Sequence, residues 1–219
     1  MRRIALATGL LVLAAAWLGP LLDDWRASFA AGMTAHMAVV AIASPLIAIG
    51  LADRWRPGPD MPVALPVLAS LFELLAVWGW HAPWMRSVAE ASVAGTIAEQ
   101  ATFLFAGIFL WSTAFAAPSQ RSHAATGAAA LLLTSIHMTL LGALLALSPR
   151  PLYGAGEVTC FGVTLDAGAD QQLGGVIMLV VGAVVYLAGG VSLIGRLVST
   201  SNVEVPKPRI TSDALQDGR

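Results

Sequence analysis

Four ionisable side chains lie within long apolar stretches of the sequence: His36, Glu73, Glu99 and His137. An ionisable group inside a membrane segment is costly, so each such residue is by default a candidate for a functional site. Imidazole binds copper and haem iron, and imidazole together with a thioether suits the soft ion Cu(I). A metal site is therefore the first functional hypothesis that these residues raise.

Methionines flank the first of these histidines at helical spacing. Met33, His36 and Met37 stand at positions i, i+3 and i+4, which share one face of a helix. A nearby carboxylate would orient the imidazoles or attract a cation. The full set of candidate metal ligands is His36, Met37, His81, Glu99, His137 and Asp170. The alternative interpretations are hydrogen-bonding struts between helices for the histidines and core filler for the methionines.

The composition indicates what kind of scaffold holds these residues. Of the 219 residues, 57% are hydrophobic and 11% are charged, whereas a soluble domain carries about 25% charged residues. The net charge of −1 provides no basic surface for nucleic-acid phosphates. Cys160 is the one cysteine, so an internal disulfide framework is excluded. The sequence is typical of a polytopic membrane protein.

The apolar segments predict an all-α transmembrane helix bundle. A bilayer core about 30 Å thick requires about 20 mostly apolar residues per helix. Six segments qualify, at residues 4–22, 29–51, 61–80, 97–117, 124–147 and 173–195. We expect one transmembrane domain over residues 1–197 and a polar, disordered cytoplasmic tail over residues 198–219. A sevenfold glycine spacing at the last span predicts close approach of another helix: Gly168, Gly175, Gly182 and Gly189.

The basic residues predict the orientation of this bundle. With the N-terminus inside, nine of the twelve Lys and Arg residues fall on the cytoplasmic side, where such residues are enriched. The three on the outside are Arg26, Arg86 and Arg150. Both termini are therefore expected in the cytoplasm.

The first apolar segment has a second interpretation. The Arg2-Arg3 pair, the apolar run and the alanines at 14–16 resemble a signal peptide with a cleavage site. The apolar run continues to Leu22, which favours an uncleaved membrane anchor. Cleavage would leave five spans in the same orientation.

Most of the polar candidates then fall in the outer half of the membrane. At 1.5 Å per residue, His36 and Glu73 lie about 10 Å below the outer ends of their helices. Those at or near an outer helix end are His81, Glu99 and Asp170. His137 is nearer the middle of its helix. This convergence predicts a shallow site that is loaded or unloaded from the extracytoplasmic side.

Five short motifs occur in a recognisable order. They are Ala35-His36-Met37, His81-Ala82-Pro83, Glu99 with Phe103-Leu104, Gly107 and Trp111, Pro151-Leu152-Tyr153, and Asp170-Gln171-Gln172-Leu173-Gly174-Gly175 with Met178. Together they cover about residues 32–178 and resemble the CtaG-type integral membrane proteins, which are linked to assembly of bacterial haem–copper cytochrome c oxidases. The family often carries a histidine where this sequence has Gly32, Thr96 and Gln100.

The resemblance implies a multi-pass protein of the bacterial cytoplasmic (inner) membrane that acts without enzymatic chemistry. The implied partner is a nascent cytochrome c oxidase subunit, and the implied cargo is copper, passed on by ligand exchange from the extracytoplasmic side. His36 and His81 would contact the metal, while Glu99 and Asp170 would orient them or attract the cation. A homodimer is one assembly that we consider.

Two functions from other classes stay open. Facing histidines serve as axial ligands in membrane carriers of b-type haem, and His36 with His137 would provide one pair. A small copper or proton permease would use Glu73 and His137 as inner steps of a path. The sequence shows no nucleophile–base pair, phosphate loop or zinc-protease helix, so we expect no enzymatic activity.

Overall fold

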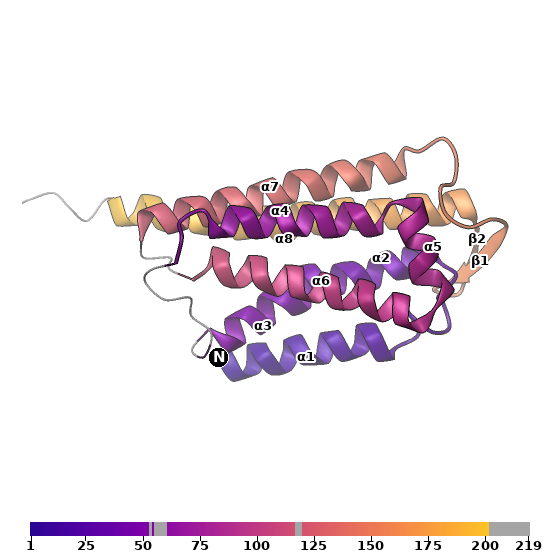
Figure 1. Cartoon of the computed structure of the whole chain (residues 1–219), viewed down its shortest axis with the longest axis horizontal. Coiled ribbons are helices and arrows are strands. Elements are labelled where there is room, and N and C mark those ends of the chain that lie inside the picture. Colours follow the sequence, from indigo (N-terminus) through magenta and orange to yellow (C-terminus); the bar gives the residue numbers. More distant parts are fainter. Residues whose placement is uncertain (53, 55–60, 117–119, 202–219) are drawn as a thin grey trace, which may run out of the picture.

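The computed structural model describes residues 1–52, 54, 61–116 and 120–201, and helices make up most of this part. The helices are α1 (Arg2–Leu18), α2 (Phe29–Met37), the π-helix η1 (Ala38–Ala43), α3 (Ser44–Leu51), α4 (Leu65–Trp80), α5 (Pro83–Ala91), α6 (Val93–Ala114), α7 (Arg121–Ala146) and α8 (Ala167–Ser201). The long helices lie side by side along the longest axis of the molecule (Figure 1). The predicted helix bundle is confirmed.

Within the described residues, four helical segments are long and apolar enough to cross a membrane: Phe29–Leu51, Val93–Ala114, Arg121–Ala146 and Ala167–Ser199. Helices α4 and α5 form a pair bent by 74°, which makes a fifth if the pair is counted as one span. Because α1 has 17 residues and α4 has 16, the number of six spans stays a prediction.

Two helix ends differ from the expected boundaries. Helix α1 stops at Leu18 rather than at residue 22, because Gly19 is extended (φ −89°, ψ −176°) and Pro20 follows it. Helix α8 continues to Ser201, so the boundary expected at residue 197 falls inside a helix. The remainder of the expected tail, residues 202–219, lies outside the described residues, as does most of the loop at 53–60.

A π-helix interrupts the segment from Phe29 to Leu51. Pro45 has no backbone N–H and stands at the start of α3, so the preceding turn must widen or lose a hydrogen bond. Ser44 donates its hydroxyl to the Val39 carbonyl over 2.8 Å. The Val40 carbonyl accepts hydrogen bonds from Trp111 Nε1 at 3.1 Å and from the Tyr186 hydroxyl at 3.4 Å. Side chains from α6 and α8 therefore bond to the same carbonyl of the π-helix.

The glycines at α8 allow the close packing that their spacing predicts. A Cβ on Gly175 would lie 2.5 Å from the backbone nitrogen of Ala146 in α7. A Cβ on Gly182 would lie 3.0 Å from Met138 Cβ, and one on Gly189 would lie 2.9 Å from the Trp111 ring. Gly168 differs, because a Cβ there would meet only the nearby Asp166 side chain.

One end of the bundle carries α5 and a β-hairpin (Figure 1). Strands β1 (Glu157–Cys160) and β2 (Val163–Asp166) pair in antiparallel fashion, and we call this end of the bundle the hairpin end. Cys160 is the last residue of β1 and is buried. The turn between the strands contains Gly162 at φ +77°, a conformation that favours glycine.

Candidate metal site

The hairpin end brings together the two histidines that the sequence ranks first. His36 comes from the last turn of α2, and His81 is the residue that ends α4. Their ring centroids are 5.5 Å apart with an interplanar angle of 69°. His36 is 0% exposed and His81 is 6% exposed. Two imidazoles from different helices therefore lie next to each other inside the bundle.

The two ring nitrogens of His81 have different surroundings. Nδ1 lies 2.7 Å from the Val77 carbonyl oxygen, so Nδ1 carries the proton and donates it. Nε2 then carries the lone pair, and it lies 3.1 Å from the sulfur of Met33. Two buried atoms with available lone pairs, His81 Nε2 and Met33 Sδ, thus lie next to each other. Such an arrangement suits a soft cation.

Both ring nitrogens of His36 are buried without a hydrogen-bond partner among the described residues. The Phe103 ring packs on this imidazole, with centroids 4.1 Å apart. Buried polar atoms are normally satisfied, so an exception points to a water molecule or an ion that completes the site. His36, His81 and Met33 together form what we call the His–His–Met cluster.

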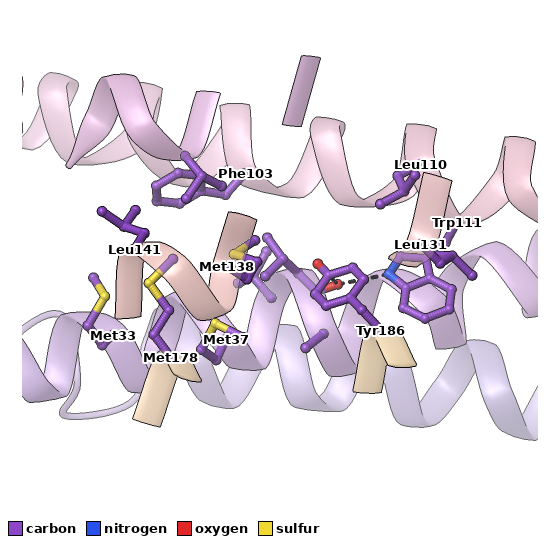
Figure 2. Close-up of a cluster of buried hydrophobic side chains, with 14 of the residues drawn as sticks. Met33, Met37, Phe103, Leu110, Trp111, Leu131, Met138, Leu141, Met178 and Tyr186 are labelled. Atoms are coloured by element: carbon purple, nitrogen blue, oxygen red, sulfur yellow. Dashed lines mark hydrogen bonds between the residues drawn. The ribbon is translucent and has the colours of Figure 1, made fainter. Parts of the chain in front are cut away.

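Met37 does not take the place that its spacing suggested. A Cβ on Gly182 of α8 would meet Met37 Cε at 3.7 Å, so the end of Met37 lies against α8. Met33 is the methionine that contacts His81. Figure 2 shows both methionines within a larger buried group that also contains Met138 and Met178. The signal for Met33 was its i, i+3 spacing to His36, but this spacing could not separate it from Met37.

Glu99 is paired with an arginine that sequence reasoning used only to orient the bundle. Arg86 Nη1 lies 3.4 Å from a Glu99 carboxylate oxygen, and Arg86 Nε lies 2.7 Å from Glu90. The guanidinium also lies over the Phe29 ring, 5.7 Å from its centroid. Arg86 is 8% exposed, and a buried guanidinium requires such partners because it stays charged. Glu99 therefore balances a charge beside the cluster.

Asp170 holds the start of α2. One carboxylate oxygen accepts hydrogen bonds from the Ser28 hydroxyl at 2.6 Å and the Ala30 backbone N–H at 3.2 Å. The other accepts from the Phe29 N–H at 2.6 Å. A carboxylate at a helix N-terminus satisfies otherwise unpaired N–H groups. Because α2 carries Met33 and His36, Asp170 positions two members of the cluster.

His137 lies in α7 and is buried. Its ring nitrogens are buried without a partner in the described residues, and no ring contact joins it to His36 or His81 there. The described residues contain no group of three or more His, Cys, Asp or Glu side chains placed to hold a metal ion. A metal at the hairpin end would therefore need the thioether of Met33 to have a third ligand.

The three positions at which this sequence departs from the family pattern line one cavity of about 20 Å³. They are Gly32, Thr96 and Gln100. Another side chain contacts the first position, and the other two form side-chain hydrogen bonds. A Cβ on Gly32 would lie 3.0 Å from Arg86 Nη2, so the guanidinium fills this space. Thr96 accepts a hydrogen bond from Arg26 at 3.1 Å, and Gln100 accepts one from Trp17 at 3.2 Å.

Tyr153 covers the cluster from the loop before the hairpin. Its hydroxyl donates to the His81 carbonyl over 2.5 Å, and its ring stacks on Phe29 with centroids 4.5 Å apart. Burial raises the pKa of Tyr153 to about 12, so the hydroxyl keeps its proton at neutral pH. Tyr153, Phe29 and Asp170 help to line a cavity of about 420 Å³. Two side chains thus belong both to this cavity and to the surroundings of His81, namely Phe29 and Tyr153.

Comparison with known proteins gives one match. Residues 1–200 match the family model described as cytochrome c oxidase caa3 assembly factor (Caa3_CtaG). No curated protein and no solved structure matches the chain. The match covers most of the sequence and agrees with the resemblance carried by the five motifs.

Proposed function

The chain belongs to the family of cytochrome c oxidase caa3 assembly factors, and from this premise we propose that it assists copper insertion into a cytochrome c oxidase. In this proposal it receives Cu(I) at the His–His–Met cluster and passes it to a nascent oxidase subunit. The transfer takes place on the extracytoplasmic side of the bacterial cytoplasmic membrane. The protein acts as a carrier and catalyses no covalent reaction.

The observation that carries this proposal is the contact of His81 Nε2 with Met33 Sδ beside the unpartnered His36 ring. Neutral imidazole and thioether are ligands that Cu(I) accepts readily. Copper is the cargo here, so the ligands must also release it. A cluster of two imidazoles and one thioether gives Cu(I) up to an acceptor that offers thiolates, because thiolates are softer and carry charge.

The proposed orientation places the hairpin end outside. All six predicted spans cross the membrane in this arrangement. They include α1, whose 17 residues extend about 25 Å at 1.5 Å per residue. The nine-to-three distribution of basic residues supports it. The cavity beside Tyr153 then opens toward the extracytoplasmic space, where the acceptor subunit would bind.

A gene deletion tests the proposal in the cell. Loss of the protein should lower cytochrome c oxidase activity while haem synthesis continues, and His36→Ala or His81→Ala should reproduce that loss although the protein accumulates. Added copper should restore part of the activity, because mass action loads the oxidase without a carrier. His123→Ala is the matched control, since His123 bonds to the Met61 carbonyl and lies at the start of α7.

The same strains distinguish the other functions. Normal oxidase activity in the deletion strain, with no redundant homologue, would contradict the proposal. A purified protein with a Soret band would instead indicate a b-type haem carrier. Copper or proton uptake into vesicles that depends on Glu73 and His137 would indicate a permease.

A further inference from the structure

Arg86 is a buried positive charge beside the proposed binding site for a cation. Its guanidinium lies over Phe29, and the Phe29 ring meets the His81 ring edge-on with centroids 6.4 Å apart. Arg86 also faces Gly32, which lies one turn before His36 in α2, because a Cβ on Gly32 would lie 3.0 Å from Arg86 Nη2. An arginine at this place opposes cation binding, so its presence requires an explanation if the cluster binds a metal.

Two carboxylates hold Arg86 at this place. It is paired with Glu90 and Glu99, and these three side chains line a cavity of about 20 Å³ together with Gly32 of α2. The Coulomb repulsion that a guanidinium exerts on a bound cation is twice as large for a divalent ion as for a monovalent ion, and a poorly solvated place screens it weakly.

We infer that the buried positive charge of Arg86 makes the His–His–Met cluster selective for monovalent soft cations, Cu(I) and its analogue Ag(I). The inference rests on the proposed copper function and specifies the ion class that the site accepts. Arg86 is well placed for this role because it cannot lose its proton to accommodate a second positive charge. Its ion pairs with Glu90 and Glu99 also hold it in position.

The size of the effect follows from Coulomb's law. For a charge about 10 Å away and an effective dielectric constant of about 20, removing one positive charge strengthens binding by on the order of tenfold per unit charge of the ion. Arg86→Gln should therefore tighten Ag(I) binding about tenfold and Zn(II) binding about a hundredfold. The preference for Ag(I) over Zn(II) should fall about tenfold.

The experiment measures Ag(I), Cu(I) and Zn(II) binding to the full-length protein in lipid nanodiscs, by competition with chelators of known affinity. Arg86→Lys keeps the charge and should keep the wild-type ratio of the ions. Arg150→Gln removes an exposed loop charge that solvent screens, so its ratio should also stay unchanged. These two controls separate the charge of Arg86 from its packing and from net charge.

Glu90→Gln provides the opposite test. The Glu90 side chain is 47% exposed, so this variant is expected to fold even if Arg86→Gln does not. Removing a negative charge should weaken Zn(II) more than Ag(I) and shift the ratio toward the monovalent ion. An unchanged ratio in both Arg86→Gln and Glu90→Gln, or in the latter alone if the former misfolds, would overturn the inference while the copper proposal stands. Wild-type protein that binds neither Cu(I) nor Ag(I) would instead overturn the copper proposal, and the inference with it.

Discussion

Two regions of the bundle bury ionisable side chains, but the partners of these side chains differ between the two regions. At the hairpin end, Arg86 pairs with Glu90 and Glu99, and both nitrogens of His36 lack hydrogen-bond partners among the described residues. A cavity of about 420 Å³ lies beside this region. The charged groups, the unpaired ligand atoms and the cavity occur together, as a site that exchanges an ion requires.

The second region lies in the middle of the bundle around Glu73. The Tyr186 hydroxyl donates to a Glu73 carboxyl oxygen over 2.8 Å, and the Tyr186 ring stacks on Trp111 with centroids 5.4 Å apart. Figure 2 shows Tyr186 beside Trp111. Both side chains bond to the Val40 carbonyl in the π-helix. This region joins four helical segments through hydrogen bonds, and none of its side chains pairs with an oppositely charged group in the described residues.

The difference shows that rarity alone does not identify a functional residue in a membrane segment. Glu73 and His36 are equally unusual in the sequence, and both are fully buried. Glu73 bonds to Tyr186, which favours a structural role. His36 has no hydrogen-bond partner in the part of the chain that the structure describes, and its ring contacts His81, a second potential ligand, which favours binding.

Removing a cluster ligand should have the largest effect on binding. His36→Ala and His81→Ala should each weaken Cu(I) binding by more than the roughly 10- to 100-fold that loss of an outer-shell partner costs. Met33→Leu should weaken it less, because a thioether is a weaker ligand than imidazole. Chelator competition measures these affinities, and Met37→Leu is the matched control for Met33→Leu. Equal losses in the two methionine variants would show that the structure assigns the wrong thioether.

Substitutions in the central region around Glu73 should change the free energy of unfolding rather than Cu(I) binding. Glu73→Leu removes the nearer acceptor of the Tyr186 hydroxyl and leaves the longer contact with the Val40 carbonyl at 3.4 Å, so we expect a loss of about 1 kcal/mol. Glu73→Gln keeps an acceptor and should be mild. Thermal unfolding in detergent measures both variants, and Cu(I) affinity should stay at the wild-type value in each.

A double variant sharpens this prediction. Tyr186→Phe removes the donor, so Glu73→Leu combined with Tyr186→Phe should cost less than the sum of the single changes. Additive losses would show that the two side chains do not interact as the structure indicates.

The sequence predicted the helices and the principal histidine pair because both depend on local pattern and depth. Apolar length located the long helices to within about six residues at each end. The placement of His36 and His81 in the outer half of the membrane suggested that they converge. The pairing of Arg86 with Glu99 and the choice of Met33 over Met37 depend on how each helix is rotated against its neighbours. Such rotation is set by packing across the bundle. The β-hairpin was also missed, because strands of four residues in a glycine-rich loop give little periodic signal.

Tyr153 should show a smaller effect that depends on pH. An unfolded tyrosine loses its proton near pH 10, whereas the pKa of Tyr153 in the folded protein is about 12. The unfolded state therefore binds fewer protons above pH 10, and the stability of the fold should fall as pH rises from 10 to 12. Tyr153→Phe should make this fall shallower in thermal unfolding measurements. An unchanged pH profile would argue against a buried Tyr153.

Introduced cysteines can test the orientation of the bundle in the membrane. These substitutions should leave Cu(I) binding unchanged. In a Cys160→Ala background, Thr159→Cys lies exposed in the hairpin and Ser122→Cys lies exposed at the start of α7. A membrane-impermeant thiol reagent should label the former in intact spheroplasts and the latter only after lysis. The reverse pattern would place the hairpin end in the cytoplasm.

X-ray absorption spectroscopy of the Cu(I)-loaded protein tests the central claim most directly, because it reports which atoms surround the metal. The account predicts two imidazole nitrogens and one sulfur, with the sulfur lost in Met33→Leu and one nitrogen lost in His36→Ala. A copper environment without sulfur, or one unchanged by both substitutions, would contradict the His–His–Met cluster as the copper site.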